Sequence, residues 1–160
     1  MMKKKLSHIN EDGHAAMVDV SAKPPKARSA TATGSVVFPA EVFQTLAQQD
    51  FLGKKGSIIQ TAIIAGIQGV KKTAELIPLC HQLNLSKVQV DIVPDESKRA
   101  LFITCNVSCT ERTGVEMEAL TGVSVAALTL YDMCKALSHN LIITAIQLEE
   151  KTGGKHDFKR

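Results

Sequence analysis

A long segment at residues 115–137 limits the folds open to this chain more than any other feature. Its apolar residues recur at intervals of three and four, which is the period of one face of an α-helix. Further apolar residues, among them Val125 and Leu128, lie off that stripe, so the predicted helix is apolar almost all round. Such a helix in a chain of 160 residues needs more than one neighbour to bury it. We therefore expect it to pack against its own sheet and against partner chains.

Shorter periodic segments surround this helix. Alternating apolar and polar residues predict strands, and three- and four-residue spacing predicts helices. The expected order is a strand at 35–38, helices at 40–49 and 57–77, strands at 88–92 and 101–109, the helix at 115–137 and a strand at 142–148. With the two early helices taken as one crossover, this order predicts an α+β fold. It is the ferredoxin-like split β-α-β sandwich with an antiparallel sheet and an extra helix, in an oligomer.

The chain length predicts one domain, preceded by an irregular arm. Residues 1–33 show no sustained period and contain two adjacent prolines, so we interpret them as an N-terminal arm. Residues 34–160 then form the single ferredoxin-like domain, with a flexible tail from residue 151.

Composition and charge exclude several classes of protein. A formal net charge of +3 and an aromatic content of 4% speak against binding to nucleic acid. The longest uncharged stretches, 57–70 and 119–131, are too short to span a membrane, and no apolar segment follows the basic start as it would in a signal peptide. The four cysteines form no C-x-x-C pair, which favours small apolar filler in a reducing compartment, and no metal site. We therefore expect a soluble cytoplasmic protein.

Two charge pairs in the long helix are candidates for chemistry. Asp132 and Lys135 are three residues apart and so are neighbours on one helix face; they form either a surface ion pair or an acid–base group. Glu116 and Glu118 start the same helix, where the helix dipole alone favours carboxylates. Two residues apart, they point to nearly opposite sides unless Glu116 precedes the first full turn.

Cationic groups and one imidazole complete the candidates. Lys54 and Lys55 lead into a helix N-terminus at Ser57, which is either a phosphate site or a solvated basic loop. Lys71 follows late in that helix, where it also complements the helix dipole. His81 is the best-placed imidazole for acid–base chemistry. Together these groups suit an anionic, phosphate-bearing small molecule.

Six blocks of the sequence resemble one known family. The blocks are residues 17–23, 64–68, 76–81, 85–88, 113–120 and 126–136, and the similarity runs from about residue 7 to 158. They resemble molybdenum cofactor biosynthesis protein C, the cyclic pyranopterin monophosphate synthase family. The resemblance implies a homohexamer, a trimer of dimers, with active sites at the dimer interface. It implies a lyase that converts 3′,8-cyclised dihydro-GTP into cyclic pyranopterin monophosphate and releases pyrophosphate.

The resemblance also implies residue roles. Asp132, Lys135 and Lys55 would be catalytic, with Lys55 and Lys135 transferring protons and Asp132 orienting Lys135. Substrate-binding positions would be Leu79, Cys80, His81, Glu116, Met117, Glu118, Lys71 and Arg28. The sequence requires no cofactor and has no metal motif, while assistance by Mg²⁺ at the phosphates stays open. The alternative is a non-catalytic relative that keeps the fold and binds a phosphate ligand.

Overall fold

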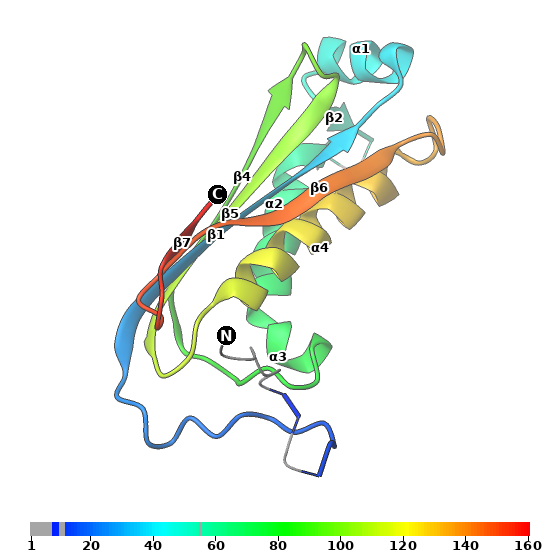
Figure 1. The fold of residues 1–160 in the computed structure, drawn as a ribbon. Coiled ribbons are helices and arrows are strands. Elements are labelled where there is room, and N and C mark those ends of the chain that lie inside the picture. Colours follow the sequence, from blue (N-terminus) through cyan, green and yellow to red (C-terminus); the bar gives the residue numbers. More distant parts are fainter. Residues whose placement is uncertain (1–7, 10–11, 55) are drawn as a thin grey trace.

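The computed structural model describes residues 8–9, 12–54 and 56–160. Within these residues, an antiparallel sheet of five strands forms one layer and two long helices form the other (Figure 1). The strands of this sheet are β1 (Lys26–Val37), β4 (Leu85–Asp95), β5 (Ala100–Glu111), β6 (Ile142–Thr152) and β7 (Phe158–Lys159). The long helices are α2 (Ile58–Lys71) and α4 (Glu116–Cys134). Smaller elements are α1 (Ala40–Gln48), α3 (Thr73–Leu76) and the paired strands β2 (Leu52–Gly53) and β3 (Gly56–Ser57).

The sheet topology confirms the ferredoxin-like prediction. Its strand order is β4-β5-β1-β6-β7. Both β1 and β4 pair antiparallel with β5, so β1 and β4 run parallel with one strand between them. Helix α2 belongs to the crossover that joins them, which makes the split β-α-β unit. Helix α4 belongs to a second crossover of this kind, which joins β5 to β6 with β1 between them.

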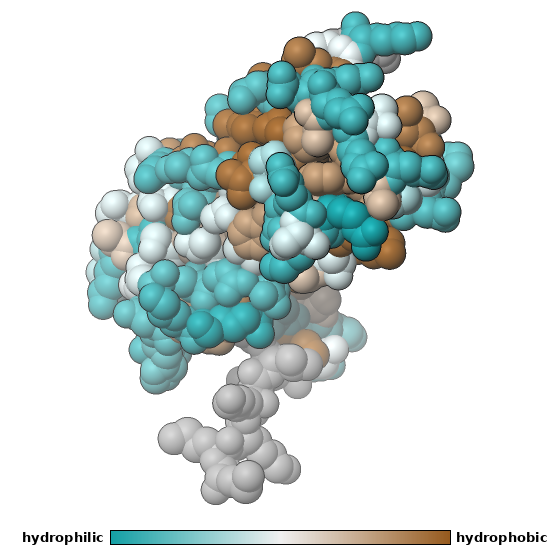
Figure 2. All heavy atoms as spheres, turned by 90° about the horizontal axis from the view of Figure 1, so that it is seen from above, coloured by the Kyte–Doolittle hydropathy of each residue, from teal (hydrophilic) through white to brown (hydrophobic). Residues whose placement is uncertain are grey.

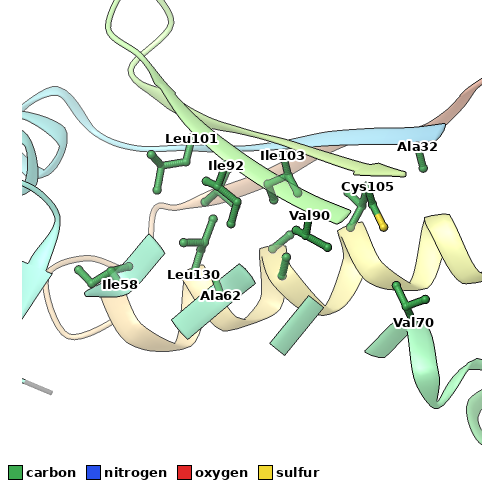
Figure 3. Close-up of a cluster of buried hydrophobic side chains, with 14 of the residues drawn as sticks. Ala32, Ile58, Ala62, Val70, Val90, Ile92, Leu101, Ile103, Cys105 and Leu130 are labelled. Carbon is green, nitrogen blue, oxygen red and sulfur yellow. The ribbon is translucent and has the colours of Figure 1, made fainter. Parts of the chain in front are cut away.

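Strand alternation decides which side of the sheet the helices cover. Along β5, every second residue from Leu101 to Cys109 is buried, while the residues between them are exposed or half-buried. Successive strand residues point to opposite faces, so these buried residues share the face toward α2 and α4. Figure 3 shows this core, with Leu101 and Ile103 from the sheet above Ala62 and Leu130 from the helices.

Small residues bring α2 and α4 close together. A Cβ atom added at Gly66 would lie 3.0 Å from the carbonyl oxygen of Gly122, and one added at Gly122 would lie 2.6 Å from Val70 Cγ2. Gly66 therefore faces Gly122 and Ala126, while Val70 faces Gly122. This pairing makes the helices antiparallel, so the start of α2 lies beside the end of α4.

Two predicted boundaries are wrong, and both errors have the same physical cause. Residues 26–33 belong to β1 and not to an irregular arm, because Lys26 pairs with Glu111 of β5. Lys151 and Thr152 belong to β6 and not to a flexible tail, because they pair with residues of β1. Both segments are held by long-range strand pairing, which a local apolar period does not reveal.

The helix predicted at 57–77 is two helices, α2 and α3, and Ser57 caps α2 as expected by accepting a hydrogen bond from the Gln60 N–H.

The long helix is apolar almost all round, as predicted. Val123, Ala126 and Leu130 are fully buried against the sheet and α2, whereas Leu128 is 60% exposed. Ile64 on α2 is 57% exposed. Apolar side chains also interrupt the polar surface when the molecule is viewed from the end that carries α1 (Figure 2). Packing against partner chains stays a prediction.

Candidate active site

A cavity of about 290 Å³ lies where the end of α2 meets the start of α4. We call it the Glu118 cavity. Its charged and titratable groups come from two helices and a loop. Lys71 ends α2, Glu118 lies in the first turn of α4, and His81 lies in the loop before β4. The lining residues are Val70, Lys71, Thr73, Ala74, His81, Gln82, Leu83, Asn84, Leu85 and Glu118. Three of the residues implied by the family resemblance therefore meet in one cavity.

Glu118 is the buried acid of this cavity. Only 4% of the residue is exposed. Burial raises the pKa of its carboxyl group, a backbone hydrogen bond opposes this, and the nearby charge of Glu116 raises the pKa further. Glu118 therefore keeps its proton to a higher pH than an exposed glutamate and can donate a hydrogen bond or a proton to a ligand.

His81 is fixed from outside the cavity. Its Nε2 atom lies 2.8 Å from the carbonyl oxygen of Val18, in the N-terminal segment. Leu79 and Cys80, also implied by the resemblance, are half-buried just before it and do not line the Glu118 cavity. Burial raises the pKa of the Cys80 thiol, and so does the charge of Glu118, which places Cys80 near that carboxyl group.

A second cavity of about 640 Å³ lies on the other side of the start of α4. We call it the Lys151 cavity. Arg28 and Glu116 line it, and so do several cations for which the sequence analysis proposed no role. Lys151 Nζ lies 2.9 Å from Glu116 Oε1, and both side chains are half-buried, with 33% and 28% exposed. The charged and titratable lining residues are Lys23, Lys26, Arg28, Arg112, Glu116, Lys151, Lys155, His156 and Asp157.

Strand pairing builds the Lys151 cavity. Arg28 lies in β1 opposite Cys109, and its guanidinium group donates to the carbonyl oxygens of Glu111 (2.8 Å) and Arg112 (3.2 Å). Gly153 turns the chain after β6 with φ of +78°, and a Cβ there would collide with the carbonyl oxygen of Ala27. The turn that follows β6 thus closes against β1 and supplies one wall of the cavity. Residues 149–152 are all polar, so the sequence carries no apolar alternation that would have placed Lys151 in a strand.

Glu116 and Glu118 point to different cavities, as their spacing predicts. Helix α4 begins at Glu116, so both residues already lie in the helical turn. Glu116 contacts Lys151, whereas Glu118 lines the smaller cavity with Lys71. Met117 lies between them, is 38% exposed and lines neither cavity. The start of α4 therefore separates two cation-lined hollows.

Asp132 and Lys135 form the predicted ion pair at the far end of α4. Lys135 Nζ lies 2.7 Å from Asp132 Oδ1. The hydrogen bond and the charge of Asp132 raise the pKa of Lys135. Both side chains are more than half exposed, at 53% for Lys135 and 69% for Asp132, so the single chain does not desolvate them. Lys135 therefore keeps its proton in this environment and acts first as a cation or an acid.

The candidate residues thus occupy opposite ends of the helix pair. Fourteen residues separate Glu118 from Asp132, which at about 1.5 Å per residue is about 21 Å along the helix. Ile58, at the start of α2, lies near Leu130 at the Asp132 end, and Val70 lies at the other (Figure 3). Lys54 precedes that start, while Lys55 falls outside the described residues. One subunit therefore does not bring Asp132 and Lys135 to the Glu118 cavity.

The described part of the chain shows neither a cluster of metal-binding side chains nor a membrane-spanning helix. No three His, Cys, Asp or Glu side chains gather there in an arrangement that could hold a metal ion. None of the described helices is long and apolar enough to cross a membrane. The four cysteines are unpaired, and Cys105, Cys109 and Cys134 are buried.

Comparison with known proteins identifies the family. The model of the MoaC family matches residues 17–154, which is most of the chain. This chain belongs to the MoaC family. The MoaC match includes the Asp132–Lys135 pair, the whole Glu118 cavity, and the Lys151 cavity apart from its lining residues 155–158.

Individual relatives agree with the MoaC assignment. The cyclic pyranopterin monophosphate synthase of Xanthomonas oryzae is 51% identical over 154 residues, covering 96% of this chain and 93% of that protein. The synthase of Magnetococcus marinus is 47% identical over 150 residues, covering 94% and 91%. Molybdenum cofactor biosynthesis protein 1 of Drosophila melanogaster is 48% identical over 155 residues, but the match spans only 27% of that longer protein.

Proposed function

We propose that this protein is a cyclic pyranopterin monophosphate synthase of molybdenum cofactor biosynthesis. Its substrate would be the 3′,8-cyclised dihydro-GTP, and its products cyclic pyranopterin monophosphate and pyrophosphate. The observation that carries the proposal is the identity of about half of all residues, over more than nine-tenths of both chains, to bacterial synthases. Residues on both sides of the start of α4 give that identity a chemical basis.

The cavities suit a substrate with a triphosphate. A triphosphate needs several cations at hydrogen-bonding distance, because each phosphate oxygen carries charge that water would otherwise solvate. Lys71 lines the Glu118 cavity, and Arg28 and Lys151 line the Lys151 cavity, where Lys151 would exchange its contact with Glu116 for a phosphate oxygen. We assign the pterin-forming end of the substrate to the Glu118 cavity, where His81 and Glu118 would hold it, and the phosphates to the cations.

The reaction needs proton transfer and charge stabilisation. A ribose-derived hydroxyl attacks the α-phosphorus, a new P–O bond forms, and the bond to the bridging oxygen of the β-phosphate breaks, so that pyrophosphate leaves. A base takes the hydroxyl proton and cations neutralise the leaving group. Ring opening and reclosure during pterin formation also move protons. We assign proton transfer to Lys55 and Lys135, with Asp132 orienting Lys135 and holding its charge.

The separation of the candidate groups supports a site shared between subunits. About 21 Å along α4 separates Glu118 from Asp132, so one subunit holds these two groups at opposite ends of the helix. A second subunit packed on the exposed apolar residues of α2 and α4 would supply the missing end. We propose a homohexamer made of three dimers, with the active sites at the dimer interface. The exposed Ile64 and Leu128 give this helix layer an apolar surface to bury.

Direct turnover tests the proposal. The purified protein is incubated with 3′,8-cyclised dihydro-GTP, the mixture is oxidised, and fluorescent pterin and pyrophosphate are measured with and without EDTA. We expect both products, with both lost in Lys55→Ala and Asp132→Ala. Substrate binding without product in a folded oligomer would instead support the non-catalytic phosphate-binding relative. Activity that survives EDTA would exclude a requirement for Mg²⁺.

Four unpaired cysteines favour action in the reducing cytoplasm.

A further inference from the structure

The N-terminal segment is joined to the Glu118 cavity through one side chain. His81 Nε2 lies 2.8 Å from the backbone oxygen of Val18, although 63 residues separate the two in sequence. A carbonyl oxygen only accepts hydrogen bonds, so Nε2 must carry a proton in this contact. When the ring is neutral, its second nitrogen, Nδ1, therefore has a free lone pair. Nδ1 has no hydrogen-bond partner in the described part of the chain.

Local turns fix the direction of the Val18 carbonyl group. Asp19 Oδ1 accepts a hydrogen bond of 2.8 Å from the Ser21 N–H, and the Lys23 N–H donates to the carbonyl oxygen of Val20 at 3.0 Å. Side-chain bonds of this kind hold a short segment in one turn. The bonds from Ser21 lower the pKa of Asp19, and the charge of His81 lowers it further, so the carboxylate lies within electrostatic reach of the imidazole.

We propose that residues 17–23 are a positioning strap for His81. The Val18 carbonyl holds the Nε2 proton, so that the neutral ring offers Nδ1 to a substrate in the Glu118 cavity beside Lys71 and Glu118. This rests on the function proposed above. A proton that leaves a substrate O–H or N–H moves to Nδ1, and the imidazolium formed keeps its Nε2–H bond to Val18. The Asp19 carboxylate then lies within electrostatic reach of a positive charge, while Glu118 of α4 and Lys71 of α2 line the same cavity as the ring.

Two truncations separate the strap from the rest of the arm. Removal of residues 1–16 leaves the strap in place and serves as the control, whereas removal of residues 1–23 takes it away. NMR of protein labelled with ¹⁵N-histidine reports whether Nε2 carries a proton that exchanges slowly with solvent. We expect that proton in the full chain and in the control, and its loss in the longer truncation. Because misplacement of a reacting group by about 1 Å costs on the order of 100-fold, we expect kcat to fall about 10- to 100-fold with KM less affected.

Two substitutions repeat the test without shortening the chain. Asp19→Asn keeps an oxygen that accepts from the Ser21 N–H and removes only the charge, whereas Asp19→Ala removes both. We expect the protected proton to survive in Asp19→Asn and to be lost in Asp19→Ala. Thermal unfolding of every variant identifies any general loss of structure, which a positioning role does not require.

Three results would overturn the strap. They are an unprotected Nε2 in the full chain, a protected Nε2 after removal of residues 1–23, and an unchanged kcat in both the longer truncation and Asp19→Ala. A full-length protein without turnover would refute the proposed function, and the strap would then stand or fall on the NMR result. The two failures are thus distinguishable.

Discussion

Substitution of Gly122 by alanine would test the close packing of α2 against α4, which brings the end of α2 to the start of α4. The added Cβ would lie 2.6 Å from both Cys105 Sγ and Val70 Cγ2, and Cys105 and Val70 are almost completely buried. Alanine gains about 1 kcal/mol over glycine in a helix interior, whereas overpacking a core costs about 1–3 kcal/mol. Because two rigid neighbours on different elements must move, we expect overpacking to prevail and the free energy of unfolding to fall by up to about 2 kcal/mol.

Denaturant and thermal unfolding at one protein concentration measure this loss. In a chain of this size, a loss of up to about 2 kcal/mol corresponds to a fall in Tm of up to about 8 °C. Gly154→Ala is the control, because a Cβ there would meet its nearest neighbouring atom, the carbonyl oxygen of His156, at an ordinary contact distance of 3.5 Å. The control should lose less stability than Gly122→Ala.

The double variant Gly122→Ala/Val70→Ala tests the assigned cause. Val70→Ala alone leaves a cavity, which the new methyl group of Ala at position 122 partly fills. The two substitutions should therefore cost less together than the sum of their separate effects. A Gly122→Ala protein more stable than wild type by the full helix-propensity gain would refute the packing argument.

Three further predictions follow from the site. Lys151→Ala leaves the Glu116 carboxylate without its ion-pair partner and removes a cation from the larger cavity. Loss of a charged hydrogen bond worth about 1.5 kcal/mol or more should raise the KM for the cyclised dihydro-GTP about tenfold. An unchanged KM would exclude Lys151 from phosphate binding. The pKa of Glu118 is raised above its ordinary 4.5, so the contribution of this residue to stability is full below pH 4.5 and is lost as pH rises through the folded-state pKa. Glu118→Gln should remove this dependence when the free energy of unfolding is measured across pH. Equal pH dependence in both proteins would contradict the assignment. Burial raises the pKa of Cys105 to about 12, so iodoacetamide near pH 8 should label Cys80 before Cys105 in the native protein, as peptide mass spectrometry would show, and faster labelling of Cys105 would contradict its burial.

The sequence predicts the layered core better than the edges of the sheet. The alternation in β5 and the three- and four-residue spacing in α4 mark faces that are truly buried, so local patterns suffice there. The first half of β1 is rich in small and polar residues, and its strand structure depends on pairing with β5 and β6. No local period reveals a strand of that kind, so the sequence predicts an irregular arm around Arg28 where the structure has β1.

The candidate site divides in the same way. Helical spacing predicts the 2.7 Å contact of Asp132 with Lys135 and the divergence of Glu116 from Glu118. It does not predict the contact of Lys151 with Glu116, because 35 residues and a change from helix to strand lie between them. The meeting of Lys71, His81 and Glu118 likewise depends on tertiary packing, and only the family resemblance grouped these residues in advance.

Mixed subunits would test most directly whether the active site is shared between chains. Glu118→Ala and Asp132→Ala proteins, each expected to be inactive, are denatured together in equal amounts and refolded, and product formation is compared with refolded wild type. In a two-fold dimer with shared sites, half of the dimers are mixed and each has one intact site, which predicts about a quarter of wild-type activity. Refolded mixtures that assemble as mixed oligomers but regain no activity would contradict the shared site. Each active site would then need Glu118 and Asp132 from the same subunit.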